Sequence, residues 1–142
     1  MFRNSLAVYQ TSSVTAAAFG THGSFVRVTG ELDLALAPSL EHAIAGEIRH
    51  GHRHLVIDLT AATFLDCASL GTLLRAIAPL RTEPDATVVL AGPKGIVKRL
   101  LDILQIGRMF DILPDADQAA DFSTNADREH VQGWRNPTPQ PR

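Results

Sequence analysis

The stretch that decides the fold is "LVIDLTAATFLDCASLGTLL", residues 55–74. It begins with the nearly unbroken apolar run "LVIDL", which is typical of a strand buried on both faces of a sheet. From Leu70 to Ile77 the apolar residues recur every three or four positions, which is the spacing of one helical face. The stretch therefore predicts a buried strand, a turn around Asp66 and an amphipathic helix.

The same alternation of strand and helix holds upstream. "SFVRVTGELD" alternates like a strand whose two faces differ. After Pro38 the apolar residues form a helical stripe, which Gly51 ends. Within residues 5–18 the short apolar pieces favour an edge strand or one arm of a hairpin.

Downstream the alternation continues. "ATVVLAG" predicts a second fully buried strand, and "PKGIVKRLLDILQIG" predicts a helix that Gly107 ends. The preceding helix is expected to close at Pro79 and the "TEPD" turn. "MFDIL" then predicts a short last strand, and "DADQAADF" a short last helix.

Strands that alternate with helices predict an α/β domain around a largely parallel sheet, because parallel strands need crossover connections. The length of 142 residues suits one domain with one core, which we place at residues 1–123. From residue 124 the pattern fails, and the remaining residues, 124–142, are polar with several prolines. This composition predicts a disordered, solvated tail. Trp134 leaves open a docking of the tail onto the domain or onto a partner.

The bulk composition excludes several classes of function. The net charge of −2 offers no basic excess for a phosphate backbone, so we expect no nucleic-acid partner. A single cysteine allows no internal disulfide, and no segment resembles a signal peptide or a membrane span, so we expect a cytoplasmic protein without membrane insertion. "GPKG" lacks the spacing of a P-loop, and no nucleophile and base are recognisable together. We therefore expect no cofactor and no enzymatic activity.

The run "HGHRH" places imidazoles at positions 50, 52 and 54. Alternate positions on an extended segment are compatible with zinc ligands. However, no nearby cysteine or carboxylate completes a ligand set. We therefore favour a solvated connector over a metal site.

Polar residues gather at the turn within the opening stretch. Asp66 directly precedes the helical periodicity, which predicts that it is the N-cap. Cys67 follows in the first turn, where the helix dipole favours a thiolate. A small packing residue near the sheet edge is the favoured role for Cys67, and a redox-sensitive thiol stays open. Asp33 follows the turn glycine Gly30 and either caps the next segment or serves in recognition at the same end of the domain.

Three separated blocks resemble the STAS domains of the anti-sigma factor antagonist family. They are "VTGELD" (residues 28–33), the opening stretch, and "GPKGIVKRLLDILQIGRMFDILPDADQAA" (residues 92–120). The family signature, approximately Phe-x-Asp-Ser-Ser/Thr-Gly-Leu-Gly, corresponds to "FLDCASLG" here. The resemblance covers roughly residues 6–122. It implies the STAS fold, a mixed and mostly parallel sheet of about five strands with about four helices.

The resemblance implies a protein-binding regulatory module rather than an enzyme. Family antagonists bind an anti-sigma factor that is a serine/threonine kinase of the GHKL type, which frees a sigma factor. Phosphorylation of the antagonist breaks the complex, because a phosphate adds about −1.5 to −2 charge at an acidic interface. The implied partner-binding residues are Glu31, Asp33, Asp66, Cys67, Ala68 and Ser69.

One position departs from the family pattern. The phosphoacceptor position is Ala68, which has no hydroxyl group. Ser69 is a displaced candidate, but one residue along a helix turns a side chain by about 100°, so a helix-start role is favoured for it. We expect a module that is not switched by phosphorylation at position 68. The alternative is a structural STAS subunit of a larger assembly, a stressosome or a lipid-transport ABC complex, and a homodimer stays open.

Overall fold

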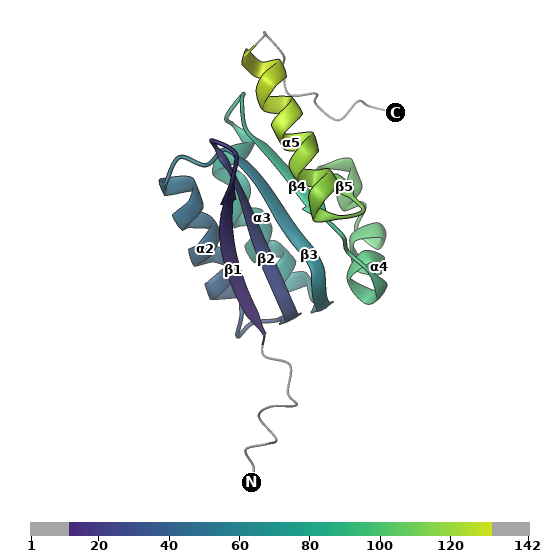
Figure 1. Ribbon diagram of the computed structural model, residues 1–142. Helices are drawn as coiled ribbons and strands as arrows, with labels where there is room; N and C mark the ends of the chain where they lie inside the picture. The colour runs from purple at the N-terminus through teal and green to yellow at the C-terminus, as the bar shows by residue number, and fades with distance from the viewer. Residues whose placement is uncertain (1–11, 132–142) are drawn as a thin grey trace.

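Figure 1 shows the computed structural model of the chain, which describes residues 12–131. The order of its elements is the predicted alternation of strands and helices. The strands are β1 (Ser13–Phe19), β2 (Gly23–Leu32), β3 (His54–Leu65), β4 (Thr87–Ala91) and β5 (Asp111–Leu113). The helices are α2 (Ala37–Arg49), α3 (Cys67–Arg81), α4 (Gly95–Ile103) and α5 (Ala116–Val131), and a 3-10 turn, η1 (Ile106–Arg108), precedes β5.

The strands form one mixed sheet in the order β1-β2-β3-β4-β5. β1 pairs antiparallel with β2, and every other pair of neighbours is parallel. The helices α2, α3 and α4 connect the parallel strands in turn. The predicted α/β class and the mostly parallel sheet are therefore confirmed. β1 occupies the end of the segment that was expected to hold an edge strand.

Strand β3 is longer than its apolar run predicted. β4 stops beside Asp58, whereas β3 continues along β2 through two register shifts. Through these irregularities β3 stays paired with β2 along the polar residues that follow its apolar run. The final residues of β2 and β3, Leu32 and Leu65, still pair with each other. The two strands therefore end side by side.

The turn after β4 packs closely on this extension of β3. Gly92 has a φ of +68°, and a Cβ at this position would collide with Oγ1 of Thr60. Glycine is the residue that permits both the left-handed backbone and the close approach. This contact fixes the position from which α4 begins.

Apolar layers cover both faces of the sheet. Ile57 of β3 packs in the larger layer with residues of α2, α3 and α4, such as Leu73. Its neighbour Val56 packs in a second layer with Ala119 of α5. Figure 1 shows α2 and α3 on one side of the sheet and α5 on the other. Successive strand residues point to opposite faces, so β3 is buried on both, as predicted.

The ends of α4 and α3 differ in part from the sequence prediction. α4 ends at Ile103 rather than near Gly107, because Gln105 adopts a left-handed backbone (φ 56°) and the chain tightens into η1. That position is the usual place for a residue that ends a helix. α3 ends at Arg81, directly before the "TEPD" turn as predicted, but Pro79 lies inside the helix and does not close it. Its missing N–H costs one hydrogen bond in the last turn, where little helix remains to be lost.

Helix α5 extends past residue 124, where the tail was expected to begin. It continues to Val131, since residues 124–131 contain no glycine or proline and include good helix formers. Trp134 and the rest of the expected tail lie outside the described residues. Among residues 12–131, no helix combines the length and the apolar character that crossing a membrane requires.

Candidate functional site

The candidate site lies where β2 and β3 end together. The last residues of these parallel strands pair with each other, and Figure 1 shows β2 and β3 as neighbours in the sheet. Asp33 and Asp66 directly follow the two strand ends. Turns at the carboxyl ends of parallel strands are where α/β proteins place their functional side chains. We call residues 31–34 and 66–69 the carboxyl-end surface.

Asp33 stabilises the turn that leads into α2. Its Oδ1 accepts the N–H groups of Ala35 at 3.0 Å and of Leu36 at 3.1 Å. Its backbone carbonyl accepts the N–H of Ala37 at 2.9 Å. Such side-chain bonds are the reason aspartate favours turns. Asp33 therefore starts the turn that leads into α2, whereas the N-cap of that helix is Leu36. The role of Asp33 in recognition stays a prediction.

Asp66 is the N-cap of α3, as predicted. Its Oδ1 accepts the N–H of Ser69 at 2.7 Å from an extended backbone conformation. This backbone hydrogen bond lowers the pKa of Asp66 below its ordinary value of 3.8. The hydroxyl of Ser69 lowers it further by proximity, although that hydroxyl makes no hydrogen bond of normal geometry. The carboxylate is therefore ionised at neutral pH.

The three residues after Asp66 differ in exposure. Cys67 and Ala68 are exposed, whereas Ser69 is 0% exposed. The expected packing role of Cys67 is wrong, because Cys67 is the first residue of α3 and the buried side of that helix begins only at Ser69. Within the described residues the Ser69 hydroxyl has no hydrogen-bond partner. A protein docking here meets the methyl group of Ala68, and the hydroxyl one residue later is covered.

Sequence reasoning missed Leu34, which lies on the same turn as Asp33. Its side chain is 74% exposed, more than any other large apolar side chain in the described part of the chain. The spacing of the apolar residues that follow could have indicated this exposure. Leu36, Leu40 and Ile44 recur every four residues and are buried, and Leu34 does not fit that stripe.

The carboxyl-end surface combines one large exposed apolar side chain with several carboxylates. Leu34 lies in a segment that also carries the carboxylates of Glu31 and Asp33, and Asp66 follows the adjacent strand. The imidazole of His54 is remote, because it begins β3 and a strand of that length spans about 40 Å. An exposed leucine among carboxylates matches a partner surface that is apolar and basic.

The imidazoles of the "HGHRH" run serve separate contacts. The ring Nδ1 of His54 lies 3.0 Å from Oγ1 of Thr87. The Nε2 of His52 lies 3.7 Å from Oε1 of Glu47, and His50 is exposed at the end of α2. Within residues 12–131, no group of three or more His, Cys, Asp or Glu side chains is placed to hold a metal ion.

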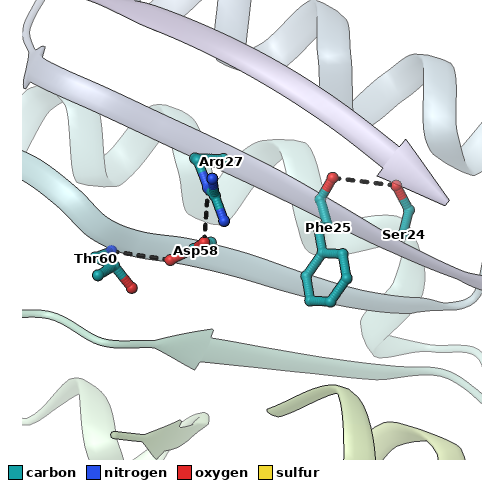
Figure 2. A network of polar contacts seen from close by, with 5 residues as sticks. All are labelled: Ser24, Phe25, Arg27, Asp58 and Thr60. Carbon is teal, nitrogen blue, oxygen red and sulfur yellow. Dashed lines mark hydrogen bonds and ion pairs between the residues drawn. The ribbon is translucent and has the colours of Figure 1, made fainter. Parts of the chain in front are cut away.

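A second polar network crosses from β2 to the middle of β3 (Figure 2). Asp58 is 0% exposed, its Oδ2 lies 2.8 Å from Nε of Arg27, and its Oδ1 accepts the N–H of Thr60 at 3.0 Å. Burial is the largest influence on the pKa of Asp58 and raises it. Hydrogen bonds from Thr60 and Arg27 together outweigh burial and hold the pKa below 3.8. This network joins β2 and β3 beside their first register shift, so we assign it a structural role.

A family model and solved structures match the chain. The model of the STAS domain matches residues 14–119. An anti-sigma factor antagonist from Mycobacterium paratuberculosis is 29% identical, with a TM-score of 0.67 over 80% of this chain and 95% of that chain.

Two structures of SpoIIAA share the fold at lower identity. The unphosphorylated anti-sigma factor antagonist SpoIIAA is 16% identical, with a TM-score of 0.62 over 86% of this chain and 100% of that chain. The phosphorylated form of SpoIIAA, a Bacillus cell fate determinant, is also 16% identical. Its TM-score is 0.63 over 78% of this chain and 98% of that chain. The expected mixed sheet with its surrounding helices is confirmed by these likenesses.

Proposed function

Since the chain belongs to the STAS domain family, we propose that it acts as an anti-sigma factor antagonist. It binds an anti-sigma factor that is a serine/threonine kinase of the GHKL type, and this binding releases a sigma factor. The likeness to the antagonist from Mycobacterium paratuberculosis supports the proposal. A protein with this task acts in the cytoplasm, by binding and without catalysis of its own.

The observation that carries the proposal is the exposed Leu34 at the paired ends of β2 and β3. Its 74% exposure leaves apolar area for a partner to cover. Asp33 is fixed by its turn hydrogen bonds, and Asp66 by its cap on α3. Both carboxylates are therefore held in place before a partner arrives, which lowers the entropy cost of binding.

The partner does not switch the complex off by phosphorylation at position 68. Ala68 is exposed where the family carries its acceptor, but it offers no hydroxyl. The nearest downstream hydroxyl, on Ser69, is completely buried. Phosphorylation of Ser69 would first require the start of α3 to unfold. The complex therefore either forms constitutively, whichever nucleotide the partner holds, or is controlled by another state of the partner or by the exposed thiol of Cys67.

The test measures binding to GHKL-type anti-sigma factors of the source organism by calorimetry, with ADP and with ATP. We expect the unmodified chain to bind equally in both and to carry no phosphate by mass spectrometry. Ala68→Ser should accept phosphate and lose at least about tenfold in affinity, or about 1.4 kcal/mol. Ser69→Ala is the matched control and should behave like the unmodified chain.

The variant Leu34→Asp tests the surface itself. It places a charge where a partner would bury an apolar side chain, so affinity should fall at least about tenfold. Stoichiometric phosphate on Ser69 would contradict the proposed control. Binding of permease or ATPase subunits in place of any such kinase would instead support the structural-subunit alternative.

A further inference from the structure

Exposed apolar side chains of the described residues are concentrated on α4 and the turn after it. Five large apolar side chains are exposed within residues 12–125, the range for which side-chain burial is described, and only Leu34 lies outside this segment. Proteins that act as monomers rarely expose such a cluster, because it costs free energy in water. The other four are Ile96, Ile103, Leu104 and Met109.

Ile96 and Ile103 share one side of α4. They are two helical turns apart, so their side chains point in the same direction. Ile96 is 55% and Ile103 66% exposed, while Val97 and Leu101 on the inner side are fully buried. α4 therefore presents apolar side chains both to the core and to its outer side.

A shallow depression of about 550 Å³ lies on this outer side. The starting glycine of α4, Gly95, has no other heavy atom near the place where a Cβ would stand. A bulky side chain from another molecule can therefore approach this position without a collision. The depression is lined by Gly95, Ile96, Lys98, Arg99 and Asp102.

In this depression the basic side chains precede the acidic one along the helix. Lys98 and Arg99 precede Asp102, and the Nζ of Lys98 lies 2.9 Å from both carboxylate oxygens of Asp102. Arg99 makes no ion pair within the part of the chain that the structure describes. A carboxylate offers about four acceptor positions, so Asp102 can accept a second cation.

We infer that this outer side of α4 binds the same side of a second copy of the chain. With two copies of α4 antiparallel about a twofold axis near Arg99, Ile96 of each copy lies against Ile103 of the other. Arg99 of each copy then reaches Asp102 of the other. The axis makes every match occur twice, as a closed, self-complementary interface requires.

This face shares no residue with the carboxyl-end surface. The inference therefore does not depend on the proposed function, and either of them can fail alone. The axis also limits the assembly to two copies, because each copy uses its α4 face once.

The first test is the mass of the full-length protein in solution, by light scattering across a range of concentrations. We expect twice the 15.3 kDa of one chain. Ile103→Asp should raise the dimer dissociation constant at least about tenfold, because the change enters the interface twice. Leu34→Asp is the matched control, since it adds the same charge at an exposed leucine outside the face and should leave the mass unchanged.

The second test fixes the orientation of the two helices by cysteine cross-linking with diamide, in a Cys67→Ser background. Ile96→Cys with Ile103→Cys should form a disulfide-linked dimer. Either change alone should not, because equivalent positions lie apart in an antiparallel pair. The two cysteines cannot join within one chain, since they are about 10 Å apart along the helix and a disulfide needs Cα atoms within about 7 Å.

Three results would overturn the inference. A protein that stays monomeric at every concentration has no such interface. A dimer whose dissociation constant is unchanged by Ile103→Asp uses a different surface. Single cysteine variants that cross-link as well as the double variant exclude the antiparallel arrangement.

Discussion

Asp58 and Asp66 belong to the same strand and the turn that ends it, yet their surroundings are opposite. Asp58 is 0% exposed in the middle of β3 and is bound by Arg27 and Thr60. Asp66 is half-exposed after the end of the strand and is held by one N–H group of α3. Both carboxyl groups have lowered pKa values. At Asp58 the large opposing effect of burial on the pKa is overcome by hydrogen bonds from Thr60 and Arg27. At Asp66 the interactions with Ser69 lower the pKa against little opposition.

The difference separates a structural carboxylate from one that a partner can reach. Asp58 is 0% exposed and uses both oxygens within the chain, so another molecule cannot reach it. Asp66 keeps its helix start ordered with one oxygen and stands on the carboxyl-end surface. A lowered pKa alone therefore does not separate the buried Asp58 from the accessible Asp66, and the proposed site rests on exposure beside the strand ends instead.

The largest effect is expected from Asp58→Ala, which should lower the free energy of unfolding by about 2–3 kcal/mol. It removes a buried acceptor and leaves the N–H of Thr60 unpaired. Arg27 is 56% exposed and can regain water, which keeps the loss below that of a fully buried pair. Urea denaturation followed by circular dichroism measures the change.

Asp58→Asn is the matched control for that change. It keeps the shape and one acceptor for Thr60 but removes the charge opposite Arg27. We expect about half of the loss seen with alanine. Equal stability of Asp58→Ala and the unmodified protein would contradict the structural role of the network.

Acid unfolding should also reveal how much the Asp58 carboxylate contributes to stability. Because the folded pKa of Asp58 lies below 3.8, the folded state binds fewer protons than the unfolded chain as pH falls. The stabilisation is complete above the ordinary aspartate pKa and is lost as pH falls below about 4. Asp58→Asn should flatten this loss in a series of urea titrations from about pH 5 to pH 3. If stability falls with pH equally in Asp58→Asn and in the unmodified protein, a group other than Asp58 causes the loss.

The fold followed from the sequence because apolar periodicity is a local signal. The runs in β3, β4 and α3 are long and regular, so their type was predictable. The extension of β3 to Leu65 was not, since register shifts depend on the pairing of β2 with β3. The early end of α4 at Ile103 rests on the left-handed backbone of Gln105, which its residue type does not favour.

The candidate site was only partly readable from the sequence. The cap at Asp66 was predictable, because it needs only a carboxylate before a helical stripe. The exposure of Cys67 and the burial of Ser69 were not, because they depend on how α3 packs on the sheet. Leu34 was overlooked because a leucine near a helix start is normally assigned to the core.

A smaller effect is expected from Asp66→Ala, which removes the cap of α3 but no buried pair. The free energy of unfolding should fall by about 1 kcal/mol. Asp66→Asn retains an N-cap residue and should lose only a few tenths of that, because only the charge at the helix start disappears. Thermal unfolding of the three proteins measures the difference. A loss as large as that of Asp58→Ala would erase the distinction between the two carboxylates.

The smallest effect is expected from Ser69→Ala, three residues after the N-cap Asp66. The Ser69 hydroxyl is buried without a hydrogen bond of normal geometry, so its removal relieves a desolvation cost that we expect to exceed its weak interaction with the Asp66 carboxylate. The free energy of unfolding should stay the same or rise by up to about 1 kcal/mol. Cys67→Ser, at the exposed neighbour, should change it by less than about 0.5 kcal/mol. A clear loss in Ser69→Ala would show that its hydroxyl supports the turn, and the case for a buried, idle hydroxyl beside Ala68 would then fail.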